Sequence, residues 1–283
     1  MEDLDFVTPP AKPTFDTRVA LKYFKASGSP LNLASGDTIF VEKEKNGLLS
    51  FRRDKMYFLV EGEVELTANN SRVGTVNGGE IFGEMTLITD MPRTASATAR
   101  TDCRLYTLDR DQLHSALGAA PEFGLLLMSI MITRLRDTIS RLETNGAFSP
   151  GKGQEDSGIF DTRLLRTLED ELDESARIPY TAKKVIMSEG QAGVLMFVVL
   201  EGSVDIVIHG NVVATIGPGG MFGEMALITR GERVASAYAK TDCILLAINR
   251  NVFLDLVGAN PKFAVALLGA VGNRARFMAS QQI

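Results

Sequence analysis

An internal repeat is the feature of this sequence that most constrains its fold. Residues 82–85, which read Phe-Gly-Glu-Met, return as residues 222–225, and residues 101–103, Thr-Asp-Cys, return as residues 241–243. Both matches have the same spacing of 140 residues, and more than a third of the surrounding positions are identical without a gap. Self-similarity over such a length indicates two copies of one domain.

The repeat also sets the expected domain boundaries. We predict a first domain over residues 1–145 and a second over residues 160–283, because Phe-Asp-Thr-Arg occurs near the start of both. Residues 146–159 between them are rich in Gly, Ser and charged side chains, as flexible linkers are. Residues 146–153 resemble a phosphate-binding loop but end in Gly153, where Ser or Thr would hold magnesium. That run is therefore interpreted as linker.

The composition is that of an ordinary globular protein, with 45% hydrophobic and 23% charged residues. The 35 acidic and 30 basic residues give a net charge of −5, whereas proteins that hold a nucleic-acid backbone carry excess positive charge. No apolar run approaches the roughly 20 residues that span a bilayer, and the acidic N-terminus lacks the features of a secretory signal. We therefore expect a cytoplasmic protein that binds neither nucleic acid nor membrane.

The histidines and cysteines predict no metal site and no disulfide framework. His114 and His209 have no second ligand at metal-binding spacing, so we expect them on a helix surface and in a turn. Cys103 and Cys243 enter a strand at equivalent positions and are expected to be small buried residues. Because the sequence also lacks a nucleophile elbow and a complete phosphate-binding loop, it does not predict an enzyme.

Each copy has the pattern of helix, short strands, helix. Apolar residues follow an Asp-Thr pair at the start of each copy, as at a capped helix start. Alternating apolar runs at residues 55–66 and 196–208 end at turns that contain Asn, and further short strands follow. Apolar spacings of three and four predict closing helices over Pro121–Thr144 and Pro261–Ser280. The predicted fold is therefore two tandem, mainly β barrels or sandwiches with flanking helices.

The residues that carry chemistry lie between residues 82 and 96 and at the equivalent positions of the second copy. Gly83 allows the backbone to approach a ligand closely, and a short helix starting here points N–H groups toward an anion. Arg93 offers a planar pair of donors to phosphate oxygens. Glu84 beside an anion is explained if it accepts hydrogen bonds from ligand hydroxyls, such as those of a ribose. Together these groups predict a pocket for a nucleotide monophosphate.

The order Phe-Gly-Glu-x-x-Leu-Ile, followed by Arg-x-Ala, resembles the phosphate-binding cassette of cyclic nucleotide-binding domains. That family includes the bacterial catabolite activator and the regulatory subunits of protein kinase A. The resemblance covers nearly the whole chain, twice. It implies two jelly-roll barrels that hold cAMP or cGMP as a regulatory ligand, with no catalytic cofactor. It places Glu84 and Glu224 on the ribose 2′-hydroxyl, and Arg93 and Arg233 on the cyclic phosphate.

The resemblance implies a set of ligand contacts in each cassette. In the first copy these are Gly83, Glu84, Met85, Thr86, Arg93, Thr94 and Ala95, and in the second Gly223, Glu224, Met225, Ala226, Arg233, Val234 and Ala235. Thr138 on the first closing helix stands where the catabolite activator has a threonine that meets adenine, and Met278 is its counterpart. A threonine there is also common on a solvent-facing surface. A barrel without ligand, in which Glu and Arg pair with each other, stays open as the alternative for both sites.

The second cassette departs from the family's pattern at two positions. Glu232 stands where the first copy has Pro92, and it places a negative charge near the anion, which the positive charge of Arg230 is able to offset. Val234 stands where the first copy has Thr94, and it lacks the hydroxyl that can bond the phosphate. We therefore expect unequal sites, with the first site tighter and more selective for adenine.

These features predict a receptor for a cyclic nucleotide, cAMP above all, that signals to an unidentified effector protein through movement of its closing helices. The apolar pattern of Pro121–Thr144 covers two faces, which predicts packing on Pro261–Ser280 or on the same helix of a second chain in a homodimer. Two other classes stay open. One is a ligand-free tandem-barrel scaffold, and the other is a transcription regulator without its own DNA-binding domain, since the last helix is expected to end near Ile283.

Overall fold

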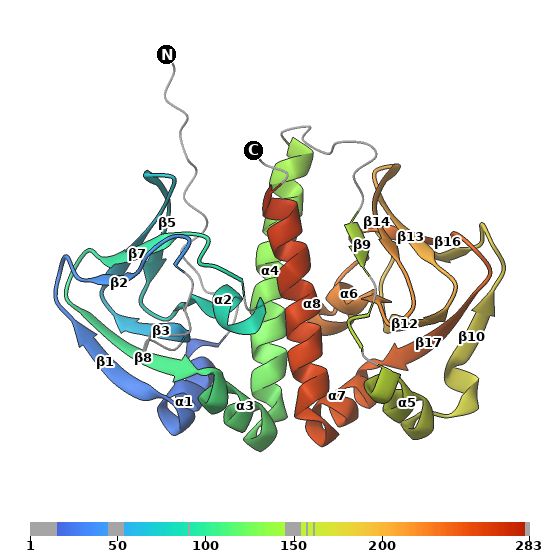
Figure 1. Ribbon diagram of the computed structural model, residues 1–283, viewed down its shortest axis with the longest axis horizontal. Helices are drawn as coiled ribbons and strands as arrows, with labels where there is room; N and C mark the ends of the chain where they lie inside the picture. The colour runs from blue at the N-terminus through green and yellow to red at the C-terminus, as the bar shows by residue number, and fades with distance from the viewer. Residues whose placement is uncertain are drawn as a thin grey trace, which may run out of the picture. The chain divides into compact units, whose positions relative to one another are not determined.

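In the computed structural model, the described residues are 16–44, 54–89, 91–144, 154–156, 158–160 and 162–280. The chain divides into two compact units, Met1–Phe123 and Gly124–Ile283. These units differ from the sequence repeats at one helix, α4 (Pro121–Thr144), which Figure 1 labels. The helix closes the first repeat in sequence, but from Gly124 onward it belongs to the second unit.

The first unit is built from two antiparallel sheets with helices around them. One sheet has the strand order β1-β8-β3-β6 and the other the order β2-β7-β4-β5. The strands are β1 (Ser29–Leu33), β2 (Thr38–Phe40), β3 (Lys55–Glu61), β4 (Glu63–Ala68), β5 (Ser71–Asn77), β6 (Ile81–Phe82), β7 (Ser96–Ala99) and β8 (Cys103–Asp109). The helices are α1 (Thr17–Ser27), α2 (Glu84–Thr89) and α3 (Arg110–Ala119).

The second unit repeats this plan after α4. Its sheets have the strand orders β10-β17-β12-β15 and β11-β16-β13-β14-β9. The strands are β9 (Gln154–Asp156), β10 (Arg177–Tyr180), β11 (Val185–Met187), β12 (Leu195–Glu201), β13 (Val204–Ile208), β14 (Asn211–Ile216), β15 (Met221–Phe222), β16 (Ser236–Ala239) and β17 (Cys243–Asn249). The helices are α5 (Thr162–Glu171), the short 3-10 helix η1 (Glu174–Ala176), α6 (Glu224–Thr229), α7 (Arg250–Ala259) and α8 (Pro261–Ser280).

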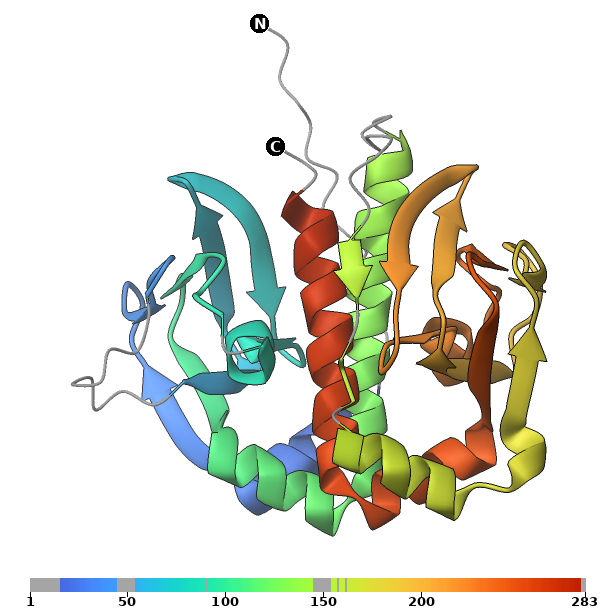
Figure 2. The same ribbon diagram turned by 45° about the vertical axis from the view of Figure 1, so that its right-hand side comes forward.

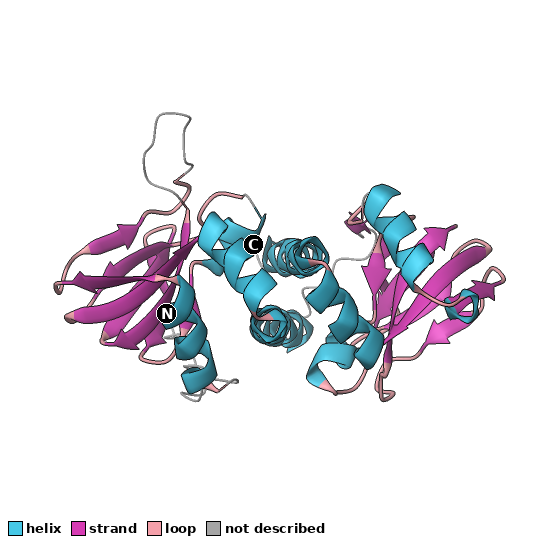
Figure 3. Ribbon diagram, turned by 90° about the horizontal axis from the view of Figure 1, so that it is seen from below, coloured by secondary structure: helices cyan, strands magenta, loops and turns pink. Residues whose placement is uncertain are grey.

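Each unit has a hydrophobic core to which both of its sheets contribute, because successive strand residues point to opposite faces. In β7, for example, Ala97 and Ala99 are buried, while Ser96 and Thr98 are partly exposed. The first core contains Phe40, Tyr57, Leu59, Val64, Val76, Phe82, Ala97, Ala99, Cys103 and Leu105. The second contains Phe197, Val199, Val204, Ile216, Phe222, Ala237, Ala239, Cys243 and Leu245. Figure 3 shows the strands of each unit gathered into layers.

A glycine divides the long apolar run of each copy into two strands. The alternation at residues 55–66 predicted one continuous run, whereas β3 and β4 lie in different sheets. Between them Gly62 has a φ of 103°, and a Cβ at this position would lie 2.6 Å from the carbonyl oxygen of Asp102. Gly202 has a φ of 78° between β12 and β13. The chain therefore changes sheets at a glycine, which alternation alone does not reveal.

We expect Gly62→Ala to lower the free energy of unfolding by about 3 kcal/mol or more, since it adds a steric clash to left-handed backbone strain. Gly36→Ala is the matched control. Gly36 also has a positive φ, 93°, but a Cβ there would meet no atom within 4 Å. That variant should lose only about 1 kcal/mol. Urea unfolding of both variants measures the difference, and equal losses would contradict the close approach at Gly62.

A short strand from the segment between the repeats joins the second unit. β9 pairs in parallel with β14, and the two strands lie side by side in Figure 2. The amide of Phe160 then donates to the carbonyl oxygen of Gly219 at 3.0 Å. The predicted linker, 146–159, thus contains a strand, because edge pairing uses backbone groups that leave no apolar pattern in the sequence. The run at 146–153 that resembles a phosphate-binding loop lies outside the described residues.

The closing helices α4 and α8 have the predicted bounds, but α3 and α7 before them were not predicted. Asp109 at the start of α3 accepts a hydrogen bond from the amide of Gln112, and the Gln112 side chain accepts one from the amide of Asp109. This capping box is the sequence signal for the helix. No single helix among the described residues is long and apolar enough to cross a membrane, and two bent helix pairs reach that apolar length only when their halves are combined.

The histidines and cysteines lie where the sequence predicted. His114 is exposed on α3, and His209 is in the turn after β13 with a φ of 48°. Cys103 and Cys243 are free and buried. Within the described ranges, no three His, Cys, Asp or Glu side chains form a group that could hold a metal ion.

Candidate functional site

Each cassette begins where a short strand ends at a left-handed glycine. In the first unit, β6 leads into Gly83, which has a φ of 72°, and α2 follows. In the second, Gly223 has a φ of 82° and precedes α6 without offering a side-chain cap. The chain then loops to Arg93 or Arg233, both of which are buried before the next strand. Helix-end amides, a carboxylate and a guanidinium thus belong to one short stretch of each unit.

Two backbone carbonyl groups fix the guanidinium of Arg93. Its Nη1 donates to the carbonyl oxygen of Gly83 at 2.7 Å, and its Nη2 donates to that of Lys55 at 2.9 Å. A Cβ on Gly83 would lie only 3.0 Å from Nη1, so glycine is what permits the approach. A guanidinium has five N–H donors, and these bonds leave the others in a fixed orientation.

Phe40 and Asp54 complete the surroundings of Arg93. Its Cζ lies 4.2 Å from the centroid of the Phe40 ring, which is a cation–π distance. Its Nη2 lies 4.0 Å from Oδ1 of Asp54. Burial lowers the pKa of the Arg93 guanidinium from its usual value, and Tyr57 and Asp54 are among the groups that oppose this shift. Since arginine remains protonated at neutral pH, this cassette presents a buried positive charge.

Arg233 makes equivalent contacts in the second unit. Its Nη1 donates to the carbonyl oxygen of Gly223 at 2.7 Å, and its Nη2 donates to that of Leu195 at 2.6 Å. A Cβ on Gly193 would lie 2.7 Å from Cζ of Arg233, so the backbone of Gly193 lies against this guanidinium. In the first unit, the ring of Phe40 lies against the guanidinium of Arg93. Burial lowers the pKa of Arg233, and Glu224 opposes the shift.

The glutamate of each cassette is also buried, with Glu84 only 3% and Glu224 only 2% exposed. In the second unit, Nη1 of Arg274 on α8 donates to Oε1 of Glu224 at 2.8 Å, and its Nη2 donates to the carbonyl oxygen of Met221. A buried carboxylate needs such a partner, because the removal of an unpaired charge from water is costly. A carboxylate has about four acceptor positions, so Glu224 retains capacity for ligand hydroxyls.

One cavity in the second unit collects all of the residues expected at the second site. Its lining includes Gly223, Glu224, Met225, Ala226, Arg233, Val234 and Ala235. Apolar walls are added by Met187, Ile206, Ile208, Val213, Ala214, Ile216 and Phe222. Leu135 and Ile139 of α4 and Arg274 and Met278 of α8 complete the lining, and Figures 1 and 3 show these two helices side by side. Apolar walls with a few convergent charged groups suit a small anionic ligand that has a flat apolar part.

The expected residues of the first site occupy the matching stretch of the first unit. Glu84, Thr86 and Arg93 are buried, and Thr94 is exposed. Thr138 lies on α4, where its hydroxyl donates to the carbonyl oxygen of Arg134 at 2.9 Å. It is not among the residues that line the cavity of the second unit, and its predicted contact with adenine belongs to the first site, where it stays a prediction.

Sequence reasoning missed the contribution of α4 to the second cavity. Leu135 and Ile139 have helical spacing, but spacing does not say which cassette a helix faces. The partner of Glu224 was also missed, although Arg134 and Arg274 occupy equivalent positions in the two closing helices. That recurrence, together with the need of a buried glutamate for a cation, is the signal that identifies Arg274.

Comparisons with known proteins identify the same domain family in both repeats. The model of the cyclic nucleotide-binding domain matches residues 30–119 and 177–260. The cAMP-dependent protein kinase regulatory subunit of Yarrowia lipolytica is 28% identical over 207 residues, which are 72% of this chain and 49% of the relative. The type II regulatory subunit of this kinase from Drosophila melanogaster is 26% identical over 233 residues, 78% of this chain and 53% of the relative. The chain spans about half the length of the curated relatives it matches.

A solved structure adds a further likeness. The regulatory subunit of a cAMP-independent protein kinase A from Trypanosoma brucei is 21% identical, and the alignment covers 90% of each chain with a TM-score of 0.32. The two matches to the family model cover more than half of this chain and contain both cassettes. The predicted fold, two tandem jelly-roll domains with flanking helices, is confirmed. The chain belongs to the cyclic nucleotide-binding domain family, with one such domain in each of its repeats.

Proposed function

We propose that this chain is a cyclic nucleotide receptor that regulates a partner protein, with cAMP as the ligand of its first site. The observation that carries the proposal is a buried arginine and a buried glutamate in each cassette, Arg93 with Glu84 and Arg233 with Glu224. A guanidinium oriented by backbone carbonyls suits the cyclic phosphate, and a buried carboxylate suits the ribose 2′-hydroxyl. Charged side chains are costly to bury for stability alone, so a ligand-binding role accounts for the presence of a buried arginine and a buried glutamate in both repeats.

The relatives suggest the kind of partner. Three relatives that match more than two thirds of this chain are named regulatory subunits of cAMP-dependent protein kinase. We therefore propose a protein kinase catalytic subunit as the partner, and a regulatory rather than catalytic role for this chain. A kinase activity assay with a purified catalytic subunit tests this part: the chain should inhibit the kinase, and cAMP should relieve the inhibition.

The ligand is tested directly by calorimetry of the purified chain with cAMP, cGMP and a cyclic dinucleotide. We expect cAMP to bind with the highest affinity. At about 100 times its dissociation constant it should add about 2.7 kcal/mol to the free energy of unfolding, a rise of several degrees in melting temperature. If none of the three nucleotides binds, the proposed function is wrong and a ligand-free scaffold takes its place.

The closing helices are the proposed output of the switch. Because α4 and α8 both line the second cavity, a bound ligand contacts both and fixes their positions. We expect saturating cAMP to slow amide hydrogen exchange severalfold in residues 124–144 and 261–280, while α5 exchanges at an unchanged rate. Exchange rates that are identical in the two helices with and without cAMP would contradict helix movement as the signal.

A further inference from the structure

We infer that Arg136 of α4 is a positioning residue that latches this helix to the second cassette and thereby slows the release of ligand from the second site. The inference rests on the proposed function, since it assumes a cyclic nucleotide in that cavity. It goes beyond that function because Arg136 does not line the cavity and is not one of the residues proposed to bind the phosphate or the ribose.

The contacts of Arg136 join α4 to the loop between α6 and β16. Its Nη2 donates to Oγ1 of Thr229 at 3.2 Å and to the carbonyl oxygen of Glu232 at 3.0 Å. Thr229 is the last residue of α6, and Glu232 directly precedes Arg233. One charged nitrogen therefore ties α4 to the end of α6 and to the middle of the loop, next to the arginine that we propose binds phosphate.

The second cassette leaves room for this guanidinium at Gly231. A Cβ at this position would lie 3.3 Å from Oγ1 of Thr229, which is tighter than an ordinary contact, and 3.4 Å from Nη2 of Arg136, so a side chain longer than that of alanine would meet the guanidinium. The first cassette has Met91 at the equivalent position, and Met91 is 45% exposed. The space for the latch is thus a property of the second cassette that the first does not share.

The partial burial of the Arg136 guanidinium has an energetic cost, which indicates that its position serves the second site. Nε of Arg136 is buried and has no hydrogen-bond partner among the described residues. Burial also lowers the pKa of the guanidinium, and Glu232 opposes the shift. An arginine on a solvent-facing helix surface would avoid both costs, so an unsatisfied buried donor of this kind calls for a function.

The neighbours of Arg136 on the helix connect the latch to the ligand. Leu135 and Ile139 line the cavity, so α4 forms part of its wall. Movement of this wall away from the cassette must first break both hydrogen bonds of the charged Nη2. A bond to a charged donor is about twice as strong as a neutral one, so the latch should act mainly on the dissociation rate.

The test measures the release of isotope-labelled cAMP from the second site in a Glu84→Ala/Arg93→Ala background, which removes both buried charged groups of the first site. Arg136→Ala removes the latch, and Gly231→Met introduces the residue of the first cassette and displaces the guanidinium. Arg166→Ala is the control, because Arg166 is an exposed arginine on α5 of the same unit. We expect both latch variants to release cAMP about tenfold faster with an unchanged association rate, and the control to match its parent.

Amide hydrogen exchange without nucleotide keeps this inference separate from the proposed function. Both latch variants should then exchange faster over residues 124–144 and 230–234 than the parent protein. If the parent binds cAMP but Arg136→Ala and Gly231→Met release it at the parental rate, the latch is refuted. If the parent binds no cAMP, the proposed function fails at this site, and exchange decides the latch: faster exchange supports it, and unchanged exchange overturns it.

Discussion

Replacing Arg93 with alanine is expected to weaken cAMP binding to the first site about a hundredfold. The guanidinium is 6% exposed and is held by the carbonyl oxygens of Gly83 and Lys55, so its orientation is fixed before any ligand arrives. Loss of a charged, preoriented donor to phosphate costs on the order of 3 kcal/mol, which is about a hundredfold in the dissociation constant. Calorimetric titration with cAMP measures the loss.

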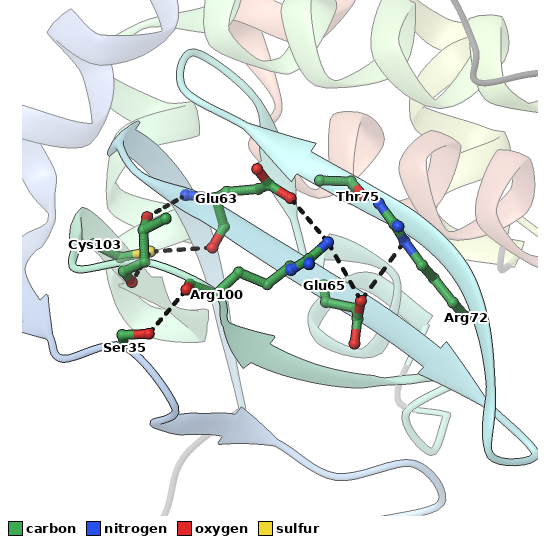
Figure 4. A network of polar contacts seen from close by, with 8 residues as sticks. Ser35, Glu63, Glu65, Arg72, Thr75, Arg100 and Cys103 are labelled. Carbon is green, nitrogen blue, oxygen red and sulfur yellow. Dashed lines mark hydrogen bonds and ion pairs between the residues drawn. The ribbon is translucent and has the colours of Figure 1, made fainter.

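Two further variants show whether the loss comes from the site. Arg93→Lys keeps the positive charge but lacks the planar guanidinium, which can donate to two carbonyl oxygens and a phosphate at once. This variant should therefore recover only part of the affinity for cAMP. Arg100→Ala removes an arginine from the exposed network in Figure 4, where Nη1 lies 3.4 Å from Glu63 and 3.7 Å from Glu65. This control should bind cAMP within about twofold of the unmodified protein, since an exposed ion pair contributes little. Unchanged affinity in Arg93→Ala would remove Arg93 from the site.

The same measurement with Glu84→Ala examines the ribose. We expect the unmodified protein to prefer cAMP over 2′-deoxy-cAMP and Glu84→Ala to bind the two with similar affinity, because the buried acceptor for the 2′-hydroxyl is gone. A preference for cAMP that persists in the variant would show that another group recognises the hydroxyl.

The fold and the cassettes were predictable because the repeat placed the same residue types at the same spacing twice. Gly83, Glu84 and Arg93 have counterparts at Gly223, Glu224 and Arg233. The same three residues in a single copy would have been harder to recognise as a site. The closing helices were predictable to the residue, since proline begins each of them and apolar spacing continues through them.

Other features depend on contacts between segments that are distant in sequence. Leu135 and Ile139 form the side of α4 that lines the second cavity. From the sequence alone, both residues would suit the core of either repeat. The pairing of β9 with β14 involves backbone groups, and the ion pair of Arg274 with Glu224 joins residues 50 positions apart. In each case the sequence shows a residue that is able to make the contact, and only packing selects its partner.

The two sites are expected to differ in affinity, with the first the tighter and more selective for adenine. Thr94 can offer a hydroxyl to the phosphate, whereas Val234 cannot, and Glu232 adds a negative charge where the first cassette has Pro92. Loss of one hydroxyl bond to a charged phosphate costs roughly 1.5–3 kcal/mol, or about 10- to 150-fold in affinity. The charge of Glu232 adds less, because its side chain is exposed and solvent screens it.

Titrations of Arg93→Ala and Arg233→Ala with cAMP separate the two sites. We expect Arg233→Ala to keep the tight binding phase and Arg93→Ala to lose it. In the Arg93→Ala background, Val234→Thr should strengthen the remaining site about tenfold. Val212→Thr makes the same change at a position on β14 that is 42% exposed and does not line the cavity, so it should leave that affinity unchanged.

A second site that is tighter than the first would also have a physical explanation, which the same variants test. Val234 and Ala235 line the second cavity together with aliphatic side chains from the sheet and from α4, so an apolar contact with a purine is available there. If tight binding survives in Arg93→Ala and is lost in Arg233→Ala, the predicted ranking is wrong. Val234→Thr would then weaken the second site, because a hydroxyl would replace a methyl group against the base. The sign of the Val234→Thr effect therefore shows whether position 234 serves the phosphate or the purine.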